Sequence, residues 1–460
     1  MTDTNIAVGG TPEERALVHA ALARPSERER MRLRELVDDI ADWPEFLALA
    51  KVNATVPLVR RRLERENRLA LLPPPVAAEF AAITDHIAEV NDRRLHAAIE
   101  LLARCHDRGI RCVVLKGMLF ATEIYRDPRY KRMNDLDILV ELDQVDDLIG
   151  VYRELGLFAT TELLGKAPKV RAERSHHLPS FVSRDGALVV GTHWGLITPL
   201  APYTVDYRAI WNRVRRIDFH GVPAWAMAHE DNLHHLGIHL PYYKTGVREL
   251  GDIWNLARGS ELDYGLLRSE IAAAGTERLM YHALSLAHRL VPIPEFGELI
   301  TWLEPDVDRF TRYDTARKTA DIHTLLRSRS THTSRIEKAY TEFNMTAVAS
   351  EKLACFGRLW SNLLLVPGDE AAKMSSLRAP TGLPALGARI AAPYRLTRVF
   401  QRDLGRWLFP AALAKTVFDL AASYGGELRG RAEKAKGIAE FAAELGLDRA
   451  ELQAVLDSQE

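Results

Sequence analysis

The chain has 460 residues and a formal charge of −1 at pH 7, with 61 Lys and Arg against 62 Asp and Glu. Its composition, 47% hydrophobic and 27% charged, excludes wholesale disorder, and its length allows about three domains of roughly 150 residues. The near-zero net charge excludes a generally basic binder of long nucleic acids, although a local patch for a tRNA end stays open, and three widely spaced cysteines exclude a disulfide framework.

The first residues, 1–14, are polar and acidic and contain no apolar signal core. The most apolar long stretch, 187–205, is interrupted by a histidine, a glycine and two prolines, so it does not read as a membrane-spanning helix. We therefore expect a soluble cytoplasmic protein with no membrane partner.

Residues 12–72 have the apolar spacing of helices, most clearly along the stretch 32–50. Three consecutive prolines, 73–75, interrupt this pattern because proline cannot continue a helix. A second long helix is predicted to follow and to end near Gly109, since glycine is the residue that most often follows a helix.

Short β-branched segments come next. Residues 110–115 (IRCVVL) predict a buried strand, Lys116-Gly117 ends it, and 118–125 return to helical spacing. Residues 135–140 (DLDILV) predict a second strand. The order strand, helix, strand predicts the start of a small α/β unit.

The remainder of this unit is predicted from turn and cap signals. Asp143 is placed to cap a helix that ends near Gly156. Asp185-Gly186 favours a tight turn, so residues 179–183 and 187–194 are expected to form a β-hairpin.

Helical spacing returns at about residue 228 and continues to the C-terminus, except in the stretch 367–393, which is rich in Pro, Gly, Ala and Ser and predicts a surface loop or linker. We expect an α+β protein with four parts. These are an N-terminal helical region (1–75), an α/β core (76–227), a second helical domain (228–405) and a C-terminal helical tail (406–460).

Two aspartates in the second strand carry the most informative chemistry. Asp135 and Asp137 lie two residues apart, so they share one face of the strand with Cα atoms about 6.6 Å apart. Carboxylates so placed are hard oxygen ligands that suit Mg²⁺, and they can hold one ion or two. The alternative is a strand whose acids only face solvent, because an isolated D-x-D is common.

The residues before the aspartates suit a phosphate-bearing substrate. Gly117 stands between a strand and a helix, where the lack of a Cβ lets phosphate approach the backbone N–H groups. Four cations precede the acids and would offset a triphosphate: Arg126, Arg129, Lys131 and Arg132. The alternative for these four residues is a solvated basic loop.

These motifs together resemble a poorly characterised bacterial nucleotidyltransferase-like family of the polymerase-β-type superfamily. The resemblance rests on L-K-G, then a helix, then R-M-N-D-L-D-I-L-V, H-H-L-P and a strand that ends in H-W. It runs from about Ala21 to near Pro393. It implies that residues 76–227 form a small mixed-sheet nucleotidyltransferase-type core within a mostly helical protein.

The resemblance also implies roles for single residues. Lys116 and Gly117, with Met118 at the start of the helix, match the loop that holds the nucleotide phosphates. Asp135 and Asp137 match the catalytic, metal-binding acids, and a basic residue often stands just before them, here Arg132. A nucleoside triphosphate (NTP) as substrate and Mg²⁺, one or two ions, as cofactor follow from this likeness.

One position departs from the family pattern. The superfamily usually adds a third carboxylate, and here Gly191 stands where the family places it, in V-V-G-T-H-W. His193 lies on the same strand face and could act as the base instead, or only form structural hydrogen bonds. Asp185 and Asp206 are other candidate acids. Whether the protein is an active enzyme therefore stays open.

Further histidines have no assigned role. His176 and His177 match family histidines, and a later helix carries His234, His235 and His239. His235 and His239 are four residues apart on one helix face, and with Asp252 they could bind zinc or a second divalent ion. The alternative is that they line the acceptor side of a cleft or form hydrogen bonds in the core.

We expect a Mg²⁺-dependent nucleotidyltransferase that moves a nucleoside monophosphate from an NTP to an unidentified acceptor, a small molecule or peptide in preference to a long nucleic acid. The helical part after residue 228 would select the acceptor. The alternative is a catalytically impaired protein of the same fold that binds nucleotide or a partner protein. A third hypothesis is transfer of another phosphoryl-type group.

Overall fold

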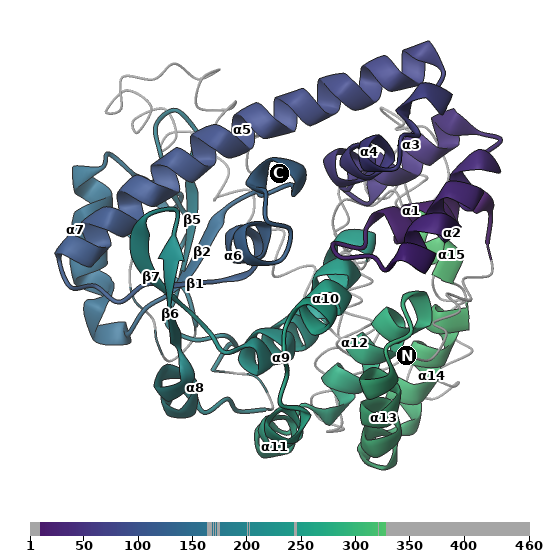
Figure 1. Ribbon diagram of the computed structural model, residues 1–460. Helices are drawn as coiled ribbons and strands as arrows, with labels where there is room; N and C mark the ends of the chain where they lie inside the picture. The colour runs from purple at the N-terminus through teal and green to yellow at the C-terminus, as the bar shows by residue number, and fades with distance from the viewer. Residues whose placement is uncertain are drawn as a thin grey trace, which may run out of the picture.

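A sheet and a helical half make up the protein. The computed structural model describes residues 10–162, 175–199, 203–242, 246–320 and 322–327, with a few single positions between them. The sheet lies on the left of Figure 1, and the N-terminal helices and the helices after residue 246 lie together on the right. No helix among the described residues combines the length and the apolar character needed to cross a bilayer.

The N-terminal region is helical, as predicted. It forms the four helices α1 (Pro12–Ala20), α2 (Glu27–Asp38), α3 (Trp43–Val52) and α4 (Val56–Arg65). The stretch 32–50, which suggested one helix, is divided because the Asp42 side chain caps α3 through the backbone N–H of Glu45. Thr11 and Ser26 form capping boxes that start α1 and α2.

A single long helix, α5 (Pro74–Asp107), joins the two halves. It begins within the three prolines because a missing N–H costs nothing in the first helical turn. It ends before Gly109, which has φ +70°, as the sequence predicted. Along its length α5 packs on α3 and α4 at one end and on the sheet and α7 at the other (Figure 1).

The sheet is mixed, which confirms the predicted α+β class. Within the described residues it has seven strands in the order β3-β4-β5-β2-β1-β7-β6. The strands are β1 (Val113–Val114), β2 (Leu136–Leu139), β3 (Phe158–Ala159), β4 (Phe181–Val182), β5 (Val189–His193), β6 (Arg215–Phe219) and β7 (Val222–Ala226). β2 pairs in parallel with β5, and β1 with β7, whereas the other pairs are antiparallel.

Most of the predicted α/β unit is present, with one correction and some additions, among them the short strand β3. The predicted hairpin forms from β4 and β5, and α6 (Lys116–Glu123) and α7 (Val145–Glu154) follow β1 and β2. Asp143 does not cap α7, because it lies in a 3-10 turn, Leu142–Gln144, before that helix. The hairpin of β6 and β7, preceded by α8 (Tyr207–Arg213), was not predicted.

A proline is the reason why the sequence does not suggest this second hairpin. Pro223 lies inside β7, where the absence of an N–H argues against a central strand. β1, however, pairs only with the later residues Trp225 and Ala226, so the proline costs no bond on that side. His220 and Gly221, both with positive φ, form the turn.

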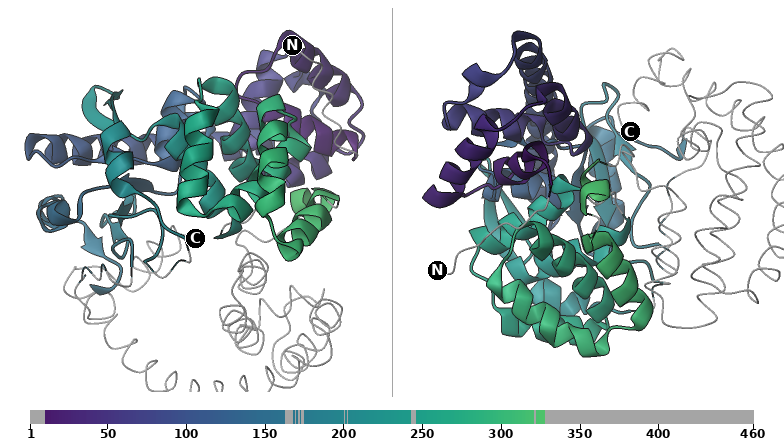
Figure 2. Two further views of the ribbon diagram at one scale, coloured as in Figure 1. Left: turned by 90° about the horizontal axis from the view of Figure 1, so that it is seen from below. Right: turned by 90° about the vertical axis from the view of Figure 1, so that its right-hand side faces the viewer.

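The helices after the sheet complete the fold. They are α9 (His229–His239), α10 (Val247–Gly259), α11 (Tyr264–Ala274), α12 (Glu277–Leu290), α13 (Pro294–Leu303), α14 (Arg309–Ala320) and α15 (Ile322–Arg327). α9 and α10 pack on each other and on α12. Figure 2 shows this group beside the N-terminal helices, and one continuous apolar core extends from Ala16 to Leu326. The predicted linker 367–393 and tail 406–460 lie outside the described residues.

Candidate active site

The two aspartates occupy the face of the sheet that the alternation predicted. Leu136 and Ile138 are fully buried in the main core, whereas Asp135 and Asp137 are half-buried on the opposite face of the chain. β2 pairs with β5 so that Asp137 lies beside Gly191 and Leu139 beside His193. Strand register therefore brings Asp137, Gly191 and His193 together.

Asp137 has partners at both carboxylate oxygens. His193 Nε2 lies 3.1 Å from Oδ1 and donates a hydrogen bond to it, and Lys116 Nζ lies 3.7 Å from Oδ2. Burial alone would raise the pKa of Asp137, but Lys116 and His193 outweigh it and hold that pKa well below its usual value. Asp137 is therefore a carboxylate at neutral pH.

The pKa of Asp135 shifts in the opposite direction from that of Asp137. Burial, followed by repulsion from Asp137, raises the pKa of Asp135 to about 7, although Lys116, Arg94 and Arg248 oppose the rise. The two carboxylates therefore repel each other when both are ionised. A divalent cation between them would remove that repulsion.

The donor set fits magnesium that is shared with a substrate. No group of three or more His, Cys, Asp or Glu side chains able to hold a metal exists among the described residues. Mg²⁺ in phosphoryl-transfer sites is usually held by one or two carboxylates and completed by phosphate oxygens and water. Asp135 and Asp137 supply this type of incomplete protein ligand set.

The start of α6 is open beside Gly117. Gly117 has an ordinary φ, and a Cβ added there would meet nothing within 4 Å, so the fold itself does not require glycine at this position. Lys116 has φ +42°, an uncommon conformation for a non-glycine residue, at the point where its amine reaches Asp137. Met118 is buried, so the structure does not expose this predicted phosphate-binding residue.

The position of the missing third acid is filled by Asp137. A Cβ built on Gly191 would lie 2.3 Å from Asp137 Oδ1, which means that the carboxylate leans over the glycine towards His193. The other candidate acids lie elsewhere: Asp185 accepts hydrogen bonds within its hairpin turn, and Asp206 caps α8.

Histidines from three parts of the chain, the segment before β4, β5 and α9, gather near Asp137 and Lys116. The rings of His176, His177 and His193 lie with centroids 4.6–5.8 Å apart, and those of His235 and His239 are 4.4 Å apart. Burial lowers the pKa of His193, His235 and His239, and the Lys116 charge lowers each of them further. His193, His235 and His239 are therefore neutral imidazoles in this wall of the site. His234 points away and hydrogen-bonds Thr276.

Asp252 does not join the histidines as the zinc hypothesis required. Its carboxylate accepts hydrogen bonds from Lys131 Nζ at 2.7 and 2.8 Å and from the Tyr125 hydroxyl at 2.9 Å. Lys131 is therefore buried and its charge is paired, so it is not one of the solvated cations that the sequence suggested. Arg129 pairs with Asp127 at 3.1 Å. Of Lys131 and Arg132, the two cations nearest the acids in sequence, Lys131 is paired with Asp252, whereas Arg132 forms no ion pair within the described part of the chain.

Two cations near Asp135 were not predicted. Arg94 on α5 donates to the Met133 carbonyl, and Arg248 on α10 acts electrostatically on Asp135. These residues lie about forty and more than a hundred positions from Asp135 in the sequence, and no local motif marks them. Only the tertiary packing of α5 and α10 brings them to the site.

The mixed sheet, the glycine-containing start of α6 and the paired aspartates define an α+β protein with a nucleotidyltransferase-type core. A family described as uncharacterised nucleotidyltransferase matches residues 39–292, more than half of the chain, and the protein belongs to that family. The match is shorter than the predicted extent, from about Ala21 to Pro393. Membership supports nucleotidyl transfer as the general class of function. No curated protein and no solved structure matches the chain.

Proposed function

We propose that this protein transfers a nucleoside monophosphate from an NTP to a hydroxyl or amine of an acceptor, with Mg²⁺ held by Asp135 and Asp137. The observation that carries the proposal is the placement of these two carboxylates on one strand face, with Lys116 Nζ 3.7 Å from Asp137 and the open start of α6 beside it. A small molecule or peptide is the favoured acceptor, because the chain has no overall positive charge for a long nucleic acid.

The bound cation would neutralise the phosphates and stabilise the charge that develops on them. The backbone at Lys116 and Gly117 would hold phosphate oxygens, and the Lys116 ammonium would add a positive charge. The attacking oxygen of a hydroxyl acceptor forms a bond to the α-phosphorus, while the bond from that phosphorus to the bridging oxygen breaks and pyrophosphate leaves.

His193 is our candidate for the group that takes the acceptor's proton. Because Asp137 is a carboxylate, Nε2 of His193 must donate to it, and Nδ1 then carries the lone pair. Burial keeps the imidazole neutral by lowering its pKa, although the hydrogen bond to Asp137 opposes that effect. A neutral ring in this tautomer can accept a proton, the task of the acid that Gly191 lacks.

The acceptor would bind on the side of α9. The histidine rings of this helix stand near Lys116 and His193 and provide neutral groups that both donate and accept hydrogen bonds. We therefore propose that the helices after residue 228 select the acceptor.

A second candidate is a protein that binds nucleotide without turnover. One observation favours it: both oxygens of Asp137 already have partners, Lys116 and His193, so a cation at Asp137 has to compete with the Lys116 ammonium. In this reading Gly191 marks the loss of the catalytic acid.

Label transfer distinguishes the two candidates. Purified protein is incubated with Mg²⁺, each α-labelled NTP and extracts of small molecules and peptides, and both product label and pyrophosphate are measured. We expect transfer by the wild type and by Asp147→Asn, an exposed acid on α7, and at least a hundredfold loss in Asp135→Asn/Asp137→Asn. Equal activity in the double variant would exclude the proposed mechanism. Nucleotide binding with no transfer in any assay would favour the second candidate.

A further inference from the structure

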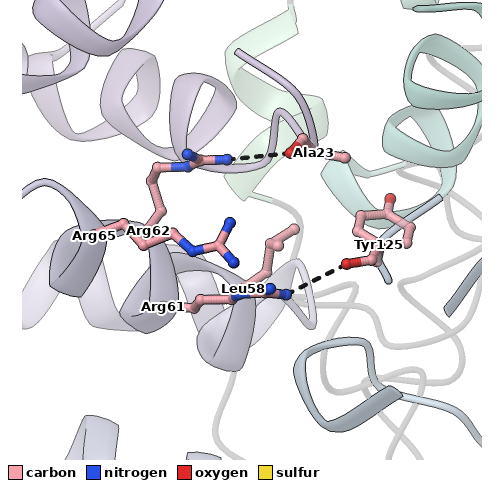
Figure 3. Close-up of a pocket in the computed structure, with 6 residues that line it drawn as sticks. All are labelled: Ala23, Leu58, Arg61, Arg62, Arg65 and Tyr125. Carbon is pink, nitrogen blue, oxygen red and sulfur yellow. Dashed lines mark hydrogen bonds between the residues drawn. The ribbon is translucent and has the colours of Figure 1, made fainter. Parts of the chain in front are cut away.

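Arginines gather where α4, the loop before β2 and the start of α10 meet. Two small cavities lie there and share Leu58 and Tyr125 in their walls. Figure 3 shows the first of them, with Arg61 and Arg62 extending from α4. Arg61 donates to the Tyr125 carbonyl at 3.3 Å, and Arg62 donates to the Leu22 carbonyl at 2.7 Å. These two arginines therefore have structural partners.

The second cavity is lined by two arginines in a different situation, Arg132 and Arg248. Arg132 makes no hydrogen bond or ion pair with any other described residue. Arg248 pairs with Glu249 through Nε at 2.8 Å and Nη2 at 2.6 Å, which leaves its Nη1 without an acceptor in the described part of the chain. The fold thus places both arginines in the wall of one cavity, and Glu249 pairs with Arg248 alone.

The positive charges of Arg132 and Arg248 repel each other. Arg132 as a whole is exposed, yet partial desolvation lowers the pKa of its guanidinium, and the charge of Arg248 lowers it further. Arg248 in turn interacts favourably with Asp135, and each of these two groups shifts the pKa of the other towards its charged form. An anion that binds the arginine pair beside Asp135 would remove the repulsion.

This inference rests on the proposed function and extends it to the far end of the nucleotide. The α-phosphate must lie at the aspartates, where the acceptor attacks. The β- and γ-phosphates then extend from them, and they carry most of the negative charge of an NTP. Arginine suits them because its planar fork forms two parallel hydrogen bonds with phosphate oxygens.

We propose that Arg132 and Arg248 together bind the β- and γ-phosphates of the NTP and hold the pyrophosphate as it leaves. Arg248 comes from the helical half and Arg132 from the sheet half, so the bound polyphosphate joins the two halves. A nucleoside monophosphate lacks these groups and would bind without help from either arginine.

Inorganic tripolyphosphate tests the proposal without knowledge of the base or the acceptor. Its affinity for the full chain is measured by calorimetry with and without Mg²⁺. We expect Arg132→Ala and Arg248→Ala each to weaken binding about tenfold or more, and Arg132→Lys to recover only part of the loss because the bidentate contact is absent. Arg108→Ala is the matched control, because Arg108 forms an exposed pair with Glu154.

Two results overturn the proposal: no binding of tripolyphosphate by the wild type, or wild-type affinity in both alanine variants. Melting temperatures within a few degrees of the wild type show that the variants are folded, and Arg132→Lys keeps the test valid if an alanine variant unfolds. Asp135→Asn/Asp137→Asn separates this inference from the proposed function. That variant should lose the Mg²⁺-dependent gain in affinity yet retain Mg²⁺-free binding through the arginines.

Discussion

The carboxylate of Asp137 lies over the backbone of Gly191, with its Oδ1 2.3 Å from the point where a Cβ would stand. Parallel pairing of β2 and β5 sets the two residues side by side. Because glycine leaves this space empty, Asp137 can lean towards His193 and form its 3.1 Å hydrogen bond. The absence of an acid at position 191 is therefore what allows Asp137 to take up its observed position.

Gly191→Asp should restore a third carboxylate. The Asp137 side chain is the far end of a flexible group and can turn away, so we expect the variant to fold. With three carboxylates on one face, the affinity for Mg²⁺ should rise by about tenfold, and any transfer activity should rise with it. Calorimetry with Mg²⁺ and the label-transfer assay measure the two effects.

Gly191→Ala is the control for that variant. It displaces Asp137 in the same way but adds no ligand, so Mg²⁺ affinity should not rise. An equal gain in both variants would show that the position of Asp137, and not the missing acid, limits the site.

Mg²⁺ should stabilise the folded protein through Asp135 and Asp137. A ligand present at a hundred times its Kd adds about 2.7 kcal/mol to the free energy of unfolding. Without Mg²⁺, Asp135→Asn should be more stable than the wild type by roughly 1 kcal/mol, because it removes one of two repelling buried charges. Thermal unfolding with and without Mg²⁺ tests both statements. If Mg²⁺ raised the stability of Asp135→Asn as much as that of the wild type, the first statement would be wrong. If Asp135→Asn were less stable than the wild type without Mg²⁺, the second would be wrong.

The buried pair of Lys131 and Asp252 should be important for stability. Lys131→Met leaves the Asp252 carboxylate without its cation, and we expect a loss of about 3 kcal/mol in the free energy of unfolding. Lys131→Met/Asp252→Asn should recover part of that loss. Urea denaturation measures both.

The exposed pair of Arg129 and Asp127 is the comparison for this test. Arg129→Ala should change stability by less than about 1 kcal/mol, since surface ion pairs contribute little. Similar losses in Lys131→Met and Arg129→Ala would mean that the buried pair has no special role.

The sequence predicted those parts of the site that local patterns encode. Alternation along residues 135–140 placed Asp135 and Asp137 on one face, and that face is the one observed. The sequence could not show that the Lys131 side chain is buried, because the partner of Lys131, Asp252, lies on a helix more than a hundred residues further along the chain. Arg248 was missed for the same reason, since only the packing of α10 brings it near Asp135.

Acid should destabilise the protein through two buried histidines. Burial lowers the pKa of His19 and of His234 to about 4, from an ordinary value near 6.5. Between these pH values the unfolded chain binds more protons than the folded one, so the free energy of unfolding falls as the pH falls. Each histidine contributes roughly 1.4 kcal/mol per pH unit in that window.

Urea denaturation at pH 7 and at pH 5 tests this dependence. His19→Gln should show a smaller loss of stability between the two pH values than the wild type, whereas His96→Gln, at an exposed position, should keep the full loss. The same loss in both variants would exclude His19 as a source of the effect.

A crystal structure with Mg²⁺ and a non-hydrolysable NTP tests the central claim most directly. We predict an ion bound by Asp135 and Asp137, with phosphate oxygens above Gly117 and the Lys116 ammonium displaced from Asp137. A nucleotide bound at another place, or an Asp137 still held by His193 and Lys116 with no ion beside it, would contradict the account.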